Sequence, residues 1–174
     1  ISVHNQLVQA TSTSLYVAIT AAGGTMDAAE ARQAALRMLT RREHGRKELE
    51  GKLINKGCTA DIAAQVAAGL EAEGLLSDDR FVEALVRVRR QRGCGPLRIQ
   101  KELQQKGVAE DVVERWLDVA GDDWVEAVKR VCRRKYGGKV PKSLSERAKQ
   151  ARFLQYRGFT FDQIRQALNP RGRD

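Results

Sequence analysis

The chain has 174 residues, of which 42% are hydrophobic, 5% aromatic and 30% charged, and its formal net charge is +9. This hydrophobic fraction is enough for a core, so the composition excludes wholesale disorder and favours thin helical units over one thick globule. The three cysteines are scattered singly, which argues against a disulfide framework or a zinc site and favours a reducing, cytoplasmic location. We expect no metal and no cofactor.

Residues 1–25 carry no charged side chain. They lack the basic start of a signal peptide and are too short and too polar to span a membrane. We expect them to be upstream or added sequence, with Met26 as the natural start. A genuine flexible arm or an added strand is the alternative.

The first group of predicted helices runs from Asp27 to Gly74. A helix from Asp27 to about Glu43 is broken by Gly45, a second helix ends at Gly57, and Thr59 caps a third. Apolar residues at helical spacing predict the buried faces. These are Ala31, Ala34, Ala35, Met38 and Leu39 in the first helix, Leu49 and Leu53 in the second, and Ile62, Val66 and Leu70 in the third.

The second group begins at Ser77, which is expected to cap a fourth helix. Pro96 suits the first turn of a fifth helix, because its missing N–H would have no partner there, and Gly107 ends that helix. A sixth helix follows. The predicted inner faces are Phe81, Ala84, Leu85 and Val88, then Ile99 and Leu103, then Val112, Val113, Trp116 and Leu117.

In the third group, Asp122 is expected to cap a seventh helix with Trp124, Val128 and Val131 inside. The stretch "YGGKVPK" is a predicted loop. Capping boxes at Ser143–Glu146 and Thr160–Gln163 start the eighth and ninth helices, and Pro170 closes the structure. No segment after residue 26 alternates with period two, so the predicted class is all-α.

One phrase recurs at intervals of about 50 residues. "GRKELEGKLINKG" at 45–57 and "GPLRIQKELQQKG" at 95–107 match, and the end of "ERAKQARFLQYRG" at 146–158 matches more weakly, with Gln150 opposite Ile99. We therefore predict an elongated, monomeric array of three tandem three-helix repeats, at 26–75, 76–121 and 122–169, with a tail at 170–174. Units this small must stack to complete their cores.

The positive charge is unevenly distributed: residues 124–174 carry 14 basic and four acidic side chains, whereas the rest is nearly balanced. Such a surface favours a polyanion or an acidic protein face. Basic residues gather near helix ends, where one or two would satisfy the helix dipole, and the surplus predicts contacts to phosphates or carboxylates. The candidates are Arg41, Arg42 and Arg46; Arg87, Arg89, Arg90, Arg92, Arg98 and Lys101; and Lys129, Arg130, Arg133, Arg134 and Lys135.

Three ordered stretches make residues 30–168 resemble the bacterial RecX family: "RREHGRKELEGKLINKG", "GLLSDDRFVEALVRVRRQRGCGPLRIQKELQQKG" and "KQARFLQYRGFTFDQI". Gly45 and Cys94 depart from residues usual there, a serine and an aromatic. The resemblance implies a regulator that binds the RecA recombinase, chiefly in its filament on single-stranded DNA. It also implies inhibition of the RecA ATPase, strand exchange and coprotease activity, which restrains recombination and the SOS response.

Other functions remain compatible with the sequence. The residues show no Walker motif, nucleophile elbow or histidine cluster, so no enzyme is expected, and the Asp78–Asp79 pair is assigned to a helix dipole. A basic helix-turn-helix DNA-binding protein is the main alternative, although its second helix offers only Gln65 for reading bases. An RNA- or ribosome-associated protein is less favoured, because few aromatics are available for stacking. Weak direct DNA binding is compatible with the first two.

Overall fold

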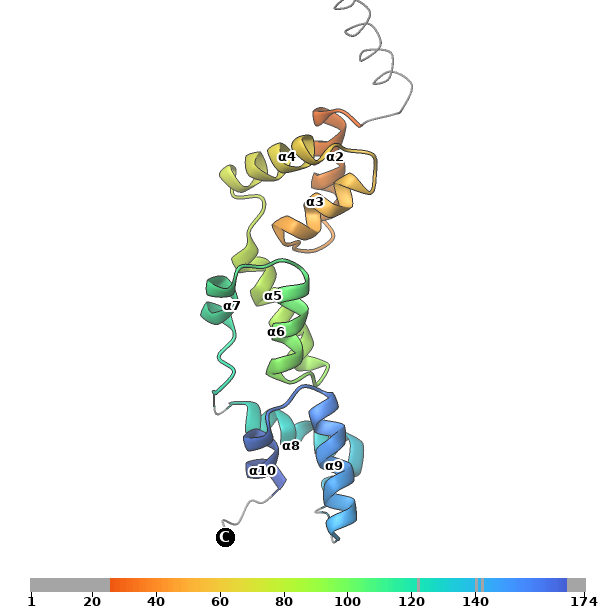
Figure 1. The fold of residues 1–174 in the computed structure, drawn as a ribbon, viewed down its shortest axis with the longest axis vertical. Helices are drawn as coiled ribbons and strands as arrows, with labels where there is room; N and C mark the ends of the chain where they lie inside the picture. Colours follow the sequence, from red (N-terminus) through yellow and green to blue (C-terminus); the bar gives the residue numbers. More distant parts are fainter. Residues whose placement is uncertain (1–25, 122, 140, 142, 169–174) are drawn as a thin grey trace, which may run out of the picture. The chain divides into compact units, whose positions relative to one another are not determined.

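The computed structural model describes residues 26–121, 123–139, 141 and 143–168, and within these ranges every regular element is a helix (Figure 1). This confirms the predicted all-α class. The described residues divide into two compact units, one formed by residues 26–42 and Glu48–Leu76, the other by Glu43–Lys47 and the described residues from Ser77 on. Expectations for residues 1–25, for Asp122 as a cap and for Pro170 lie outside the described residues.

The first unit is built on α2 (Ala28–Leu39), α4 (Ala60–Ala72) and all of α3 (Arg46–Ile54) except its first two residues, which belong to the second unit. Asp27 and Glu30 form a reciprocal capping box at the start of α2, and Thr59 caps α4 as predicted. Leu49 and Leu53 are fully buried in a hydrophobic core that also contains alanines of α2 and α4. Helix α2 ends four residues before the predicted Glu43.

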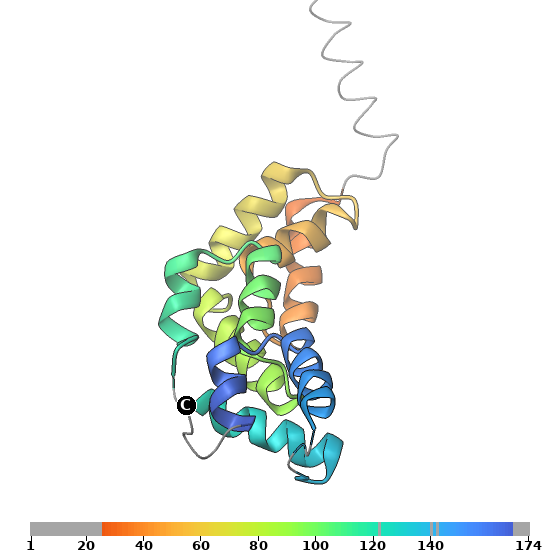
Figure 2. The same ribbon diagram turned by 60° about the horizontal axis from the view of Figure 1, so that its bottom comes forward.

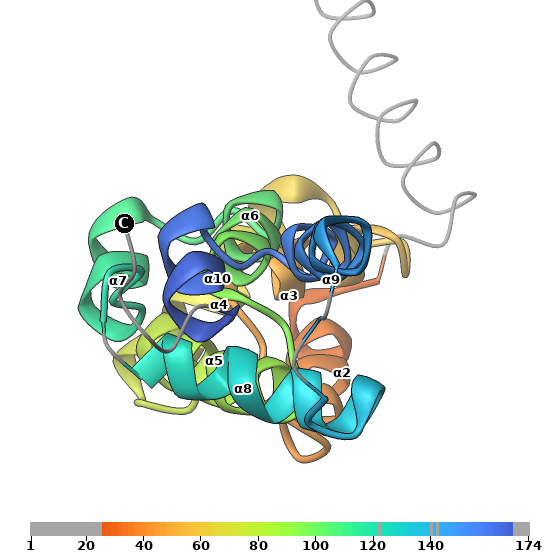
Figure 3. The same ribbon diagram turned by 90° about the horizontal axis from the view of Figure 1, so that it is seen from below.

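The second unit holds α5 (Asp78–Gln91), α6 (Pro96–Gln105), α7 (Glu110–Trp116), α8 (Asp123–Tyr136), α9 (Leu144–Tyr156) and α10 (Phe161–Leu168). Helices α5 and α6 lie side by side, and α10 packs across α8 (Figures 2 and 3). Ser77 and Ser143 cap α5 and α9 as predicted. None of the helices in the described ranges is long and apolar enough to cross a membrane.

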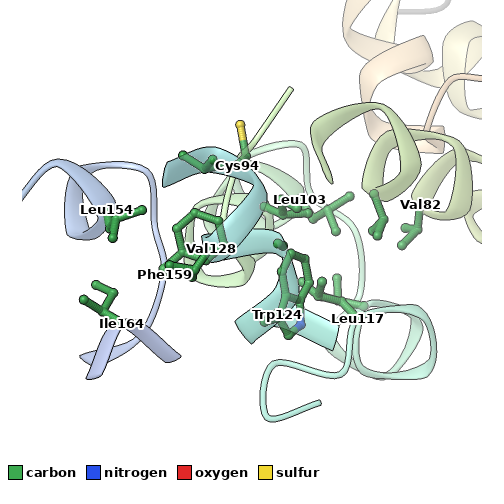
Figure 4. Packing of buried hydrophobic residues seen from close by; sticks show 14 of the residues in the cluster. Val82, Cys94, Leu103, Leu117, Trp124, Val128, Leu154, Phe159 and Ile164 are labelled. Atoms are coloured by element: carbon green, nitrogen blue, oxygen red, sulfur yellow. The ribbon is translucent and has the colours of Figure 1, made fainter. Parts of the chain in front are cut away.

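One hydrophobic core runs through all six helices of the second unit (Figure 4). Trp124 is 2% exposed, and its indole N–H donates to the carbonyl of Asp118 over 2.7 Å. Its ring meets Phe159 edge to face at 6.4 Å between centroids, which joins α8 to the chain entering α10. The second and third helix groups thus share a common core, whereas the first group has a core of its own.

The start of the second copy of the repeated phrase lies close to the end of the third copy. The N–H of Gly95 donates to the carbonyl of Arg157 over 2.8 Å, and the N–H of Leu97 to the carbonyl of Gly158 over 3.0 Å. A Cβ atom at Gly95 would overlap the backbone of Gly158 and Phe159. Glycine is therefore required there by space, and the pair of hydrogen bonds, which we call the backbone clasp, ties the start of α6 to the end of α9.

The ends of the three phrases adopt the same conformation. Gly57, Gly107 and Gly158 have φ of 102°, 73° and 89°, the left-handed region that ends a helix at low cost only for glycine. The three leucines before them, Leu53, Leu103 and Leu154, are all fully buried. Gln150, opposite Ile99 in the weaker third copy, is also buried at 8% exposure.

The predicted inner face of α5 is partly wrong. Val88 is 37% exposed, whereas Val82 and Val86 are buried beside Phe81. Two apolar stripes overlap on this helix, and packing in the second unit decides which one is buried. Trp116 is likewise 39% exposed, because its indole N–H donates to the Asp79 carboxylate over 2.7 Å and holds the ring at the surface.

Candidate basic groove

A groove of about 740 Å³ opens between the end of α5 and the face of α6, within the second unit. Five of its eight lining residues are cationic and one is acidic. The lining consists of Arg89, Arg92, Cys94, Arg98, Lys101, Glu102, Gln105 and Lys106. Two other pockets among the described residues are lined by fewer cationic side chains, three in one and one in the other.

Helical spacing explains how these side chains come to share one groove. Arg89 and Arg92 are three residues apart at the end of α5, so they lie on one face. Arg98, Lys101 and Gln105 follow at intervals of three and four along α6 and form a second row. The turn at Gly93 to Gly95 brings the two rows together, and the backbone clasp holds that turn.

The single carboxylate in the groove is held by one of the cations. Glu102 accepts two hydrogen bonds from the guanidinium of Arg89, both 2.6 Å long, in a bidentate pair. This hydrogen bonding lowers the pKa of Glu102, with Lys106 and Arg98 acting in the same direction, and it raises the pKa of Arg89. The groove therefore stays ionised at neutral pH and keeps an excess of four positive charges beyond the pair.

The remaining candidates of the middle cluster do not line the groove. The guanidinium of Arg90 lies over the ring of Trp124, 4.4 Å from its centre, and pairs with the carboxylate of Asp123 at 3.3 Å. Its charge therefore interacts with the start of α8 and not with the groove. Arg87 is exposed on α5. Of the six middle candidates, the structure brings Arg89, Arg92, Arg98 and Lys101 together and leaves the other two apart.

The first cluster follows α2 and opens α3. Arg42 pairs with Glu48 at 2.5 Å, and Arg41 is exposed. The backbone N–H of Arg46 donates to the carboxylate of Asp78 over 2.8 Å. Asp78 thus accepts a hydrogen bond from the first residue of α3. It also lies in the first turn of α5, where the sequence predicted it to be a partner of the helix dipole.

The third cluster lies on α8. Arg130, Arg133 and Arg134 are exposed, whereas Lys129 pairs with Glu126 at 2.6 Å and Lys135 lies 5.3 Å from the ring of Phe153. Lys129 and Arg133 line a smaller pocket of about 210 Å³. Helix α8 lies in the part of the sequence with the largest excess of positive charge. The pocket that its cations line is nevertheless smaller than the basic groove.

Sequence reasoning missed four lining residues, which are Cys94, Glu102, Gln105 and Lys106. Gln105 could have been found, because it continues the spacing of Arg98 and Lys101 by one turn. Lys106 lies next to the glycine that ends α6 and was not among the candidates. Cys94 is 9% exposed, and in Figure 4 its sulfur points away from the labelled core side chains.

The cysteines behave as three separate thiols within the described ranges. Cys58, Cys94 and Cys132 are unbridged, and burial raises the pKa of Cys58 and of Cys132. Among the residues placed by the structure, His, Cys, Asp and Glu form no group of three that could hold a metal ion.

Comparison with known proteins agrees with this architecture. Models of the first, second and third three-helix domains of RecX match residues 31–68, 77–117 and 122–168. The chain belongs to the RecX family. The three tandem three-helix domains predicted from the repeats are those of RecX.

Relatives and solved structures extend the match to most of the RecX chain. The Regulatory protein RecX of Halorhodospira halophila is 47% identical over 136 residues, covering 78% of this chain and 84% of that protein. The Regulatory protein RecX of a Pseudomonas fluorescens strain is 42% identical over 143 residues, covering 82% and 92%. The crystal structure of RecX from Lactobacillus salivarius has a TM-score of 0.67 at 23% identity, covering 82% of this chain and 95% of that one, and shows the same fold.

Proposed function

We propose that this protein binds the RecA recombinase in its filament on single-stranded DNA. It inhibits the ATPase, strand exchange and coprotease activities of RecA, and so restrains recombination and the SOS response. It acts by binding and not by catalysis. The observation that carries this proposal is the match of all three RecX domains, in order, over residues 31–168.

The basic groove supports this role because a nucleoprotein filament presents phosphates and carboxylates. Arg92, Arg98 and Lys101 are exposed, and their charges are not balanced by the one acidic residue of the groove. Arginine donates in a fixed fork that matches both phosphate and carboxylate. We assign the groove as the principal contact surface of the protein.

The helix-turn-helix alternative finds little support in α4, the helix that would read bases. This helix contains no lysine or arginine, and Ala63, Val66, Ala67 and Leu70 are buried. Base-reading helices present arginine, asparagine or glutamine to the major groove. Gln65 is the one exposed residue of these types in α4. The composition of α4 is therefore better explained by its packing in the core of the first unit.

The decisive experiment measures the ATPase rate of the cognate RecA on saturated single-stranded DNA while this protein is added well below one copy per RecA protomer. Clear inhibition at this ratio is expected. Inhibition only when the protein approaches the number of DNA sites would indicate simple competition for DNA and overturn the proposal.

Two triple variants test the surface. Arg92→Ala, Arg98→Ala and Lys101→Ala together should remove most of the inhibition and leave the folding transition in place. The matched variant with Arg130, Arg133 and Arg134 changed to alanine removes the same charge from α8 and should retain inhibition. If the second variant loses activity and the first keeps it, the contact surface lies on α8.

A further inference from the structure

An exposed aromatic ring stands at the edge of the basic groove. Tyr156, at the end of α9, is 80% exposed, and the guanidinium of Arg98 lies 5.8 Å from the centre of its ring. Arg98 also lines the groove. One arginine therefore contacts the ring while facing the cationic surface, and most of the ring stays open to solvent.

The backbone clasp fixes this juxtaposition. Arg157 and Gly158, which accept its two hydrogen bonds, directly follow Tyr156, and the donor residue Leu97 directly precedes Arg98. The guanidinium of Arg157 adds a hydrogen bond of 2.8 Å to the carbonyl of Arg92, on the α5 side of the groove. The ring is thus held beside the cations before any ligand arrives, which lowers the entropy lost on binding.

The lining identifies the class of ligand. Apart from Cys94 it contains only charged and amide side chains, so it offers no apolar pocket for the anchor residues on which peptide docking depends. A nucleic acid backbone needs only cations and N–H donors, which the groove supplies. A solvent-exposed ring next to such cations suits an unpaired base, because every base has a face that can stack.

We propose that the groove and Tyr156 form a binding site for single-stranded nucleic acid. Phosphates lie against Arg92, Arg98 and Lys101, and an unpaired base stacks on the open face of Tyr156. A duplex cannot use the ring without unstacking a base, so the site discriminates single strands from duplexes. This assignment deepens the proposed function because it uses the same groove, but its test contains no RecA and can fail independently.

The test is fluorescence anisotropy with the full chain and a labelled oligothymidylate of about 12 nucleotides, a length within the range of compact single-strand sites. Tyr156→Ala should weaken binding by about 10-fold, and Tyr156→Phe, which keeps the ring, should bind like the wild type. Arg98→Ala should reduce the dependence of log affinity on log salt by about 0.7, one phosphate contact. Arg147→Ala, an exposed charge on α9 outside the groove lining, is the matched control and should leave this slope unchanged.

The same variants on a labelled duplex separate stacking from charge. Tyr156→Ala should change duplex affinity by less than about twofold, since no unpaired base reaches the ring. Wild-type affinity of Tyr156→Ala for the oligothymidylate would overturn the proposal, as would an equal loss on single strand and duplex. Equal effects of Arg98→Ala and Arg147→Ala would show diffuse attraction by net charge, and would overturn it too.

Discussion

The N–H of Gly95 donates to the carbonyl of Arg157 over a distance of 2.8 Å, although the two residues are 62 positions apart. This contact lies where two copies of the internal repeat meet. It requires a residue without a side chain at position 95, because a Cβ there would overlap the backbone of Gly158. Gly95, the first residue of the second copy, therefore joins neighbouring repeats as well as capping the start of α6.

Gly95→Ala should lower the free energy of unfolding by about 1–3 kcal/mol, since the overlap forces the backbone clasp apart. The control is Gly69→Ala in α4, where a Cβ would meet nothing within 4 Å. There alanine should be neutral or stabilising by up to about 1 kcal/mol, because it favours the helix. Urea unfolding monitored by circular dichroism measures both, and equal midpoints would contradict the close approach.

Leu103→Ala should destabilise the second unit by about 2–5 kcal/mol, because it removes a fully buried side chain from the common core. Val88→Ala serves as comparison on α5, where the sequence predicted burial and the structure shows 37% exposure. That change should cost less than about 1 kcal/mol. If Val88→Ala lowered the free energy of unfolding more than Leu103→Ala, Val88 would belong to the buried face of α5, as the sequence predicted.

Gln163→Leu should cost about 1–3 kcal/mol, although it replaces a buried polar residue with an apolar one. The Gln163 side chain accepts from the N–H of Thr160 at 3.0 Å and donates to the carbonyl of Val119 at 2.7 Å. Leucine leaves both groups without these partners. Gln166→Leu, at an exposed site on the same helix, should be nearly neutral in thermal unfolding, and equal costs would argue against the buried bridge.

Acid should weaken the second unit through Glu102. Arg89 lowers the pKa of Glu102 in the folded state, so the pair contributes stability above the ordinary glutamate pKa of about 4.3. That contribution is lost as pH falls through the lower folded value. Glu102→Gln should therefore reduce stability at pH 7 and show a shallower decline between about pH 5 and pH 3. An unchanged pH profile in chemical unfolding would show that the pair adds nothing.

Many local features could be predicted from the sequence because short-range interactions determine them. Thr59, Ser77 and Ser143 cap helices with their own side chains, Pro96 occupies a first turn, and Thr160 and Gln163 form the reciprocal box that their spacing implied. The spaced leucines and glycines also revealed the three repeats. The caps and the reciprocal box each depend on residues within four positions along the chain.

Only the tertiary structure decided which cations share a surface. Net charge pointed to residues 124–174, yet the basic groove with five cationic lining residues lies in the middle repeat, where the sequence is electrically balanced. The one acidic residue of the groove, Glu102, is paired with Arg89, while Arg92, Arg98 and Lys101 stay exposed in the same groove. The same holds for Tyr156, which reaches Arg98 only through the clasp at Gly95. Charge counts sum along the chain, whereas binding depends on side chains brought together by packing between distant helices.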